Sequence, residues 1–377
     1  MRAALRPVAL AIGLVAALQT LHAATRWKIQ YLYDQAGSNF DIRDIACPSA
    51  QRCVAAGVIS DKKDHQVGAV VVTSDSGRNW SRYEVKELPL SLFFLGEEMG
   101  WMVTDRGLWS TAEGGRTWTK VESRKGILQT LFLDANHGYI AGTAGLLDET
   151  LDGGKTWTKL PAAGAASTGA VPVIDPRSVS YASITFQGPH GFIVGEIEPL
   201  KPANRSPATE RQPSGRQVMV VETLDGGKKW TAGAVAVEAG IGRLRISKLG
   251  FALALLVYED PTHPLASAVV KLILGQPNSR MIFGERDRAA TDVALLREGG
   301  AVLVAIEPPG NSPQVPIPGK LKMFESRDLT LAQAVVWEEM DVDYRAIAQA
   351  AVLAVADDHH IWVATDTGAI LGLVEGD

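Results

Sequence analysis

The chain is poor in cysteine, in surplus charge of either sign and in long apolar runs. Only 2 of its 377 residues are Cys, and 37 Lys and Arg stand against 42 Asp and Glu. Without a basic surplus, the composition does not favour a nucleic-acid partner. No apolar run reaches the roughly 20 residues that a membrane-spanning helix needs, so we expect no membrane span. An apolar fraction of 46% with 21% charged residues is typical of a folded globular chain.

The N-terminus has the order of features found in a secretory signal peptide. Two arginines precede the apolar stretch Pro7–Leu18, and Ala23 and Ala24 supply small residues for cleavage. We expect residues 1–23 to be removed, which leaves residues 24–377 as one domain in the periplasm or outside the cell. An uncleaved anchor is the alternative, and the short apolar stretch argues against it.

The two cysteines, Cys47 and Cys53, enclose five residues that include Pro48 and Ser49. In an exported protein such a pair favours a disulfide that closes a tight turn. A zinc site needs two further ligands, which are not nearby. A redox pair has the spacing C-x-x-C, which differs from this one.

Self-comparison reveals an internal repeat, Thr-x-Asp-x-Gly-x-x-Trp, which occurs four times. The spacings between successive tryptophans are 38, 39 and 73 residues, and Glu replaces Asp in the second copy. The repeated positions are Asp75, Gly77 and Trp80; Glu113, Gly115 and Trp118; Asp152, Gly154 and Trp157; and Asp225, Gly227 and Trp230.

Each residue type in this repeat has a structural reason to be there. The acid can accept hydrogen bonds from backbone N–H groups of the turn that it begins. The glycine permits a positive φ, and the tryptophan can start the next strand and pack between sheets. Because the acids recur once per repeat, we expect them to lie apart and to serve turns, not catalysis or metal binding.

A unit of four short strands in about 40 residues is typical of a β-propeller blade. We therefore predict an all-β fold, a β-propeller of seven four-stranded blades, with six or eight as alternatives. The strand-like segment Trp27–Tyr33 is expected to complete the last blade and close the ring. The predicted blades span residues 39–86, 87–123, 126–161, 180–236, 242–285, 289–340 and 343–376.

The turn motif resembles the Asp-box, or BNR, repeat. The phrase from His137 to Trp157, with its Gly-Tyr-Ile-Ala-Gly and Asp-Gly-Gly-Lys-Thr-Trp parts, is similar to the propellers of the photosystem II assembly and stability factor family. The resemblance covers about residues 70–235. It implies a non-catalytic, exported scaffold that needs no cofactor and binds a protein partner, without implying that the partner is a photosystem.

Asp-box repeats also occur in sialidases and glucan hydrolases, so a glycan-active hydrolase is the main alternative and a carbohydrate-binding module is a third. The Arg-Ile-Pro phrase of sialidases is absent. Glycoside hydrolysis needs two carboxylates that face one cleft. The acids near predicted strands that could supply them are Asp41, Asp44, Glu196, Asp292 and Asp343. Two acids and a cation converging in the central channel would favour the enzyme.

Long insertions are expected on the face opposite the Asp-box turns. Repeat proteins often bind partners on the face that carries insertions. In the longest, residues 196–216, we predict partner-binding residues at Lys201, Arg205, Arg211 and Arg216. The cluster Asp357–His360 has metal-ligand chemistry but is better explained as a polar hairpin turn, so no metal site is predicted.

Overall fold

The computed structural model describes residues 25–160, 174–198, 216–237, 239–258, 262–263, 265–274, 279–309, 318–330 and 334–375. Across these residues the fold is all-β, as predicted, and the only helical element is one 3-10 turn, Pro176–Ser178. Nothing helical in the described ranges is long and apolar enough to cross a membrane.

Five of the sheets are four-stranded, and in each the strands follow sequence order. The first contains β2 (Ser38–Ala46), β3 (Cys53–Asp61), β4 (Gln66–Thr73) and β5 (Ser81–Val85). The second contains β6 (Pro89–Phe94), β7 (Gly100–Thr104), β8 (Gly107–Thr111) and β9 (Thr119–Glu122). The third contains β10 (Ile127–Phe132), β11 (Gly138–Gly142), β12 (Leu147–Thr150) and β13 (Thr158–Lys159).

The fourth and fifth sheets continue the same order. The fourth contains β14 (Val179–Gln187), β15 (His190–Ile197), β16 (Arg216–Thr223) and β17 (Thr231–Val237). The fifth contains β18 (Gly240–Ile246), β19 (Phe251–Val257), β20 (Ser267–Ile273) and β21 (Ser279–Glu285). These sheets coincide with the first five predicted blades.

The rest of the chain forms one nine-stranded sheet, so the prediction of seven separate four-stranded blades is wrong. The order is β22-β23-β24-β25-β1-β29-β28-β27, with β26 paired to β24. The two segments predicted as the last blades merge because β1 pairs with strands of both. The strands are β1 (Thr25–Leu32), β22 (Ala289–Leu295), β23 (Ala301–Glu307), β24 (Gly319–Ser326), β25 (Glu338–Asp343), β26 (Ile347–Ala348), β27 (Ala351–Asp357), β28 (His360–Thr365) and β29 (Ala369–Glu375).

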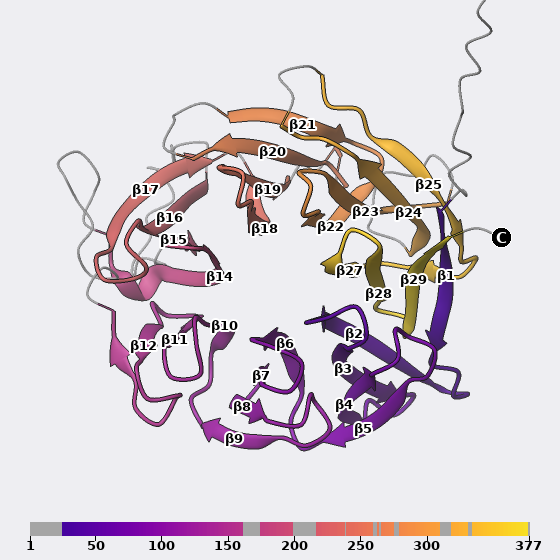
Figure 1. Ribbon diagram of the computed structural model, residues 1–377, viewed down its shortest axis with the longest axis horizontal. Helices are drawn as coiled ribbons and strands as arrows, with labels where there is room; N and C mark the ends of the chain where they lie inside the picture. Colours follow the sequence, from indigo (N-terminus) through magenta and orange to yellow (C-terminus); the bar gives the residue numbers. More distant parts are fainter. Residues whose placement is uncertain are drawn as a thin grey trace, which may run out of the picture.

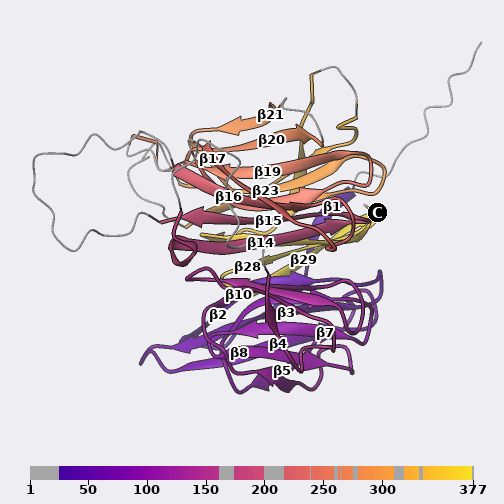
Figure 2. The same ribbon diagram turned by 90° about the vertical axis from the view of Figure 1, so that its left-hand side faces the viewer.

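The sheets are arranged radially around a central axis (Figure 1). Seen from the side, β14, β15, β16 and β17 lie one above the other (Figure 2). The innermost strands contact one another in a closed cycle, from β2 through β6, β10, β14, β18, β22 and β27 back to β2. Each sheet therefore has two covered faces, which explains why middle strands such as β7 and β11 are buried along their whole length.

The N-terminal strand β1 closes the ring, as predicted. It pairs antiparallel with β29, from Thr25 opposite Glu375 to Leu32 opposite Ala369. Its other edge pairs parallel with β25, where Arg26 lies opposite Asp341 and Lys28 opposite Asp343. Because both edges of β1 are used, the outer side of the nine-stranded sheet has no free strand edge.

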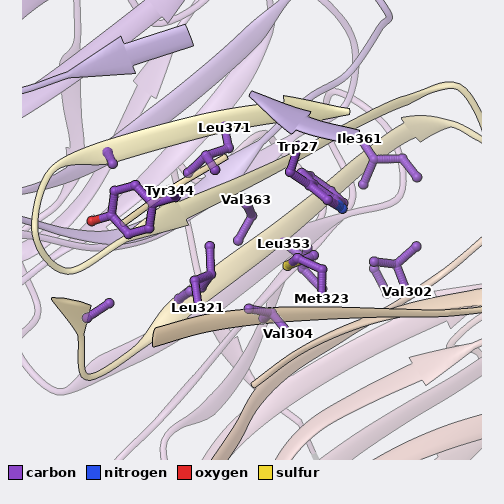
Figure 3. Packing of buried hydrophobic residues seen from close by; sticks show 14 of the residues in the cluster. Trp27, Val302, Val304, Leu321, Met323, Tyr344, Leu353, Ile361, Val363 and Leu371 are labelled. Atoms are coloured by element: carbon purple, nitrogen blue, oxygen red, sulfur yellow. The ribbon is translucent and has the colours of Figure 1, made fainter. Parts of the chain in front are cut away.

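Trp27 anchors β1 in the core of the nine-stranded sheet. Its side chain is fully buried and packs among Leu353, Met323 and Ile361 (Figure 3). The indole Nε1 lies 3.4 Å from Sδ of Met340 on β25. One side chain thus holds the N-terminal strand against strands near the C-terminal end of the described chain, with Met340 lying 313 residues later.

We expect Trp27→Ala to lower the free energy of unfolding by about 3–5 kcal/mol, because it empties a large buried site at the ring closure. Ile29→Ala on the same strand is the matched control, since Ile29 is 43% exposed and its loss should cost no more than about 0.5 kcal/mol. Urea unfolding followed by tryptophan fluorescence measures both. Equal losses in the two variants would contradict the role assigned to Trp27.

Candidate functional site

The Asp-box residues form a hydrogen-bonded turn between the third and fourth strands of their sheets. In the first copy, Asp75 Oδ1 accepts the backbone N–H of Asn79 at 2.9 Å and the hydroxyl of Thr73 at 2.9 Å. The Thr73 hydroxyl oxygen accepts the N–H of Gly77 at 3.0 Å. Trp80 follows and leads directly into β5.

The other three copies repeat this arrangement. Asp152 Oδ1 accepts from the N–H of Thr156 at 2.9 Å, and Asp225 Oδ1 accepts from the N–H of Lys229 at 2.8 Å. In the second copy the longer Glu113 accepts instead from the hydroxyl of Thr117 at 2.8 Å. In the three copies with Asp, hydrogen bonds lower the pKa of the acid. In the third copy, chiefly through the bond from the Thr156 hydroxyl, the pKa of Asp152 falls to about 2.

Two consecutive residues of each turn have positive φ. The first makes a backbone hydrogen bond within its own sheet, and the second packs against a neighbouring sheet. The first of the pair, at Ser76, Gly114, Gly153 and Gly226, donates its N–H to the turn between the first two strands of its own sheet. The second, at Gly77, Gly115, Gly154 and Gly227, lies against a neighbouring sheet. A Cβ added at Gly227 would lie 2.1 Å from Oη of Tyr139, whereas one at Gly226 would meet nothing within 4 Å.

These hydrogen bonds place both kinds of turn on one side of the ring, which we call the turn face. Links between second and third strands and between sheets lie on the other side, the insertion face. Several large apolar side chains are exposed on the turn face. They are Leu95, Met99, Leu151, Leu224, Leu249 and Val336.

Cys47 and Cys53 are joined by a disulfide across the turn between β2 and β3. The bond lies on the turn face, where the backbone carbonyl of Gln51 accepts from the N–H of Ser76 in the Asp-box turn. The disulfide therefore fixes the turn that receives the first Asp-box.

A belt of polar residues joins neighbouring innermost strands around the channel, and the sequence analysis missed it. Six innermost strands carry a register shift at an equivalent place, and the residues that follow the shifts are Asp44, Ser91, Gln129, Ser183, Arg243 and Asp292. The side chains of Asp44 and Gln129 accept backbone N–H groups of the next sheet at 2.7 and 2.6 Å. The available signal was a polar residue at the same offset in the first apolar strand of each of the first six predicted blades.

Two of the acids considered for catalysis, Asp44 and Asp292, lie in this belt with two arginines of β18. Asp292 is 1% exposed; its Oδ1 lies 3.4 Å from Nε of Arg243 and 3.5 Å from Nη2 of Arg245. The charge of Asp292 is the main cause of a raised pKa at Arg243. Burial raises the pKa of Asp44, and Arg243 counteracts part of this effect. Two acids and a cationic group thus do meet at the channel.

All four carboxylate oxygens of this pair accept backbone amides. Asp44 accepts the N–H groups of Ile45 at 3.0 Å and Leu92 at 2.7 Å. Asp292 accepts those of Val293 at 2.8 Å and Leu353 at 2.9 Å. The bonds from Leu92 and Leu353 join β2 to β6 and β22 to β27, so both acids hold neighbouring innermost strands together.

The other acids do not approach this pair. Asp41 is bound to Arg43 at 2.9 Å, Glu196 lies on β15, and Asp343 lies opposite Lys28 on the outer strands. At the turn-face end of the innermost strands, a hollow of about 320 Å³ is lined by Ala46, Thr185, Arg245 and Ala294 among others. The lining of this hollow includes one charged side chain, that of Arg245.

Tyr139 and Glu149 form a tyrosine–glutamate pair on neighbouring strands of the third sheet, β11 and β12. Tyr139 Oη donates to Glu149 Oε1 at 3.1 Å, and His137 Nε2 lies 2.8 Å from both side chains. Tyr139 is fully buried, and its ring stacks on Phe186 at 5.6 Å. Burial raises the pKa of the Tyr139 hydroxyl far above its usual value, which is the opposite of what a nucleophile needs.

The cluster Asp357–His360 forms the hairpin turn between β27 and β28. Asp357 Oδ1 accepts the N–H groups of His359 and His360 at 3.0 and 2.9 Å. Asp358 accepts those of Arg297 and Glu298 in the neighbouring turn. Among the described residues, no group of three His, Cys, Asp or Glu side chains could hold a metal ion.

Of the four predicted partner-binding residues, Lys201, Arg205 and Arg211 lie outside the described residues. Arg216 begins β16, and its Nη1 lies 3.2 and 3.1 Å from the two carboxylate oxygens of Glu196 on β15. This pair lies at the insertion-face end of the fourth sheet, where the chain enters and leaves the long insertion.

A family model described as photosynthesis system II assembly factor YCF48 matches residues 119–201. No curated protein sequence matches the chain. The structure of YCF48 bound to a D1 peptide is similar with a TM-score of 0.57 and 14% identity, over 92% of this chain and 96% of that one. The chain is a BNR-type propeller that resembles the photosystem II assembly factor.

Other propellers are also similar in fold. YCF48 from Cyanidioschyzon merolae has a TM-score of 0.55 and 13% identity, over 92% of this chain and 98% of that one. An ancestral GH74 enzyme has a TM-score of 0.54 and 12% identity, but only 46% of that chain is covered against 91% of this one. At these identities the likeness establishes the propeller fold, which catalytic and non-catalytic proteins share.

We expect Gly227→Ala to destabilise the protein more than Gly226→Ala. Both replace a glycine of positive φ, which costs about 1–2 kcal/mol. At position 227 the added methyl group also displaces Tyr139, which brings the loss to about 3 kcal/mol or more. Urea unfolding of the two variants gives the comparison, and equal losses would argue against a tight contact between the Asp-box and the neighbouring sheet.

The third Asp-box should contribute to acid stability. The pKa of Asp152 is lowered from 3.8 to about 2, so its contribution is present above about pH 4 and lost as the pH falls through 2. We expect Asp152→Asn to be less stable than the parent at pH 6, with the gap closing between pH 4 and pH 2. Urea unfolding at stepped pH tests this, and a gap that stays constant to pH 2 would contradict it.

Proposed function

We propose that the mature chain is an exported, non-catalytic propeller that binds another protein. The carrying observation is that every oxygen of the two channel carboxylates accepts a backbone amide, and that two of these amides belong to the next innermost strand. Supporting it are the YCF48 family match and the likeness to YCF48 along nearly the whole of both chains. One of those structures contains a D1 peptide, which makes peptide binding a natural use of this fold.

We propose further that residues 1–23 direct the chain to the periplasm or the exterior, and that residues 24–377 are the mature domain. The disulfide between Cys47 and Cys53 supports an oxidising compartment. The long insertion with Lys201, Arg205, Arg211 and Arg216 remains the proposed docking element. Its local charge, four cations against Glu196, Glu198 and Glu210, suits an acidic partner surface.

A glycan-active hydrolase is the second candidate, because Asp44, Asp292 and the two arginines do meet at the channel and a GH74 enzyme shares the fold. Hydrolysis requires one carboxyl to donate a proton and another to act as base or nucleophile. In both acids every oxygen accepts a backbone amide, so their observed contacts are those of residues that join neighbouring strands. The scaffold role uses these contacts as they are.

The test is affinity capture from the source organism's envelope extract with three tagged proteins: the parent, a variant with residues 199–215 replaced by a short Gly/Ser turn, and Leu151→Lys/Leu224→Lys on the turn face. Circular dichroism checks that all three fold. We expect the parent and the turn-face variant to capture the same partner and the loop variant to lose it.

If only the turn-face variant fails to capture the partner, the docking surface lies on the turn face and not on the long insertion. Capture of no protein by the parent, together with turnover of a xyloglucan or sialoside substrate that Asp292→Asn abolishes, would overturn the scaffold role.

A further inference from the structure

The outer strand of the fourth sheet, β17, differs from every other outer strand that the structure describes. Five sheets end in an outer strand with one unpaired edge: β5, β9, β13, β17 and β21. Such an edge presents free N–H and C=O groups to any extended chain, and proteins usually block it with charge, bulges, short length or a cover.

Four of these five edges carry such a block. Strand β5 has Arg82 and Glu84, and β9 has Lys120 and Glu122 with a register shift. Strand β13 is only two residues long, one of them a lysine. In the nine-stranded sheet, β1 and β25 cover each other.

Strand β21 combines several blocks. It contains Arg280 and Glu285, and a register shift interrupts its pairing with β20. The indole Nε1 of Trp337 from the adjacent sheet donates to the carbonyl of Ile282 at 2.8 Å. A second strand therefore cannot pair along this edge without displacing a tryptophan.

Among the described residues, none of these devices is present on β17. Its sequence, Thr231-Ala-Gly-Ala-Val-Ala-Val237, has no charge and no proline, and it pairs with β16 at seven consecutive positions without a register shift. Val235 is 50% exposed, and a Cβ at Gly233 would meet nothing within 4 Å. The strand lies at the outer rim of the ring (Figure 1).

We propose that the edge of β17 binds an extended segment of a partner protein as an additional strand. The segment would be uncharged, free of proline and rich in β-branched residues, because it lies beside an uncharged strand of small side chains. This inference rests on the proposed role in protein binding and specifies one mode of it, separate from the long insertion.

The edge suits a peptide better than a second copy of the chain. A stable complex of two rigid proteins buries about 1,200 Å² or more. One strand edge of seven residues on the convex rim of a ring offers less than that. A flexible segment needs only the edge, because main-chain hydrogen bonds supply its affinity.

The probe is a displayed library of nine-residue random peptides, selected on the mature protein. Peptides enriched on the parent should be uncharged and β-branched and should protect amides of residues 231–237 from hydrogen exchange. Val235→Lys places on β17 a charge of the kind that the other edges carry, and it should weaken binding of the enriched peptides at least tenfold. Met281→Lys is the matched control, because Met281 is 57% exposed on an edge that is already charged, and it should bind as the parent does.

N-methylation of the best peptide separates strand pairing from simple apolar contact. Methylation at alternate residues that face β17 should abolish binding, and methylation at the intervening residues should leave it unchanged. Absence of enriched peptides, equal binding to Val235→Lys, protection elsewhere, or self-association of the protein through β17 would each overturn the proposal. If Val235→Lys still captures a natural partner, the proposal for the edge of β17 is overturned, but the proposed role in protein binding is not.

Discussion

The structure depends on one non-local constraint: the first strand of the described chain must pair with the last. Strand β1 uses one edge for β29 and the other for β25, and Trp27 fills the core between them. Until this pairing forms, β25 and β29 each have a free edge. The same contact explains why the last strands form one sheet of nine instead of separate blades.

The polar belt around the channel serves the same closure at the centre of the ring. A side chain that follows a register shift reaches the backbone of the next innermost strand, as Asp44 does with Leu92 and Asp292 does with Leu353. Buried carboxylates are tolerated here because amides and arginines compensate their desolvation. Their presence in a channel is therefore explained by structure before any chemistry is invoked.

The sequence identified the features that repeat and missed those that depend on closure. Asp152, Gly154 and Trp157 recur in other copies at fixed spacing, so their turn could be recognised from one chain. The merging of the last sheets could not, because parallel pairing of β1 with β25 follows from a contact across the whole chain. Asp44 and Asp292 were noticed as acids, but the amides that bind them belong to other sheets. The absence of charge on β17 became informative only when it was known to be an edge.

The claim that the channel acids hold the ring and perform no chemistry is tested most directly by Asp292→Asn against Asp41→Asn, with unfolding free energy and glycan hydrolysis measured on the same samples. Asp292 is buried with two arginines, so Asp292→Asn should lower the free energy of unfolding by about 3 kcal/mol. Neither the parent nor this variant should hydrolyse a glycan. Asp41 pairs with Arg43 at the surface and should cost less than about 1 kcal/mol. An Asp292→Asn variant that keeps its stability but loses a measurable hydrolysis would contradict the account.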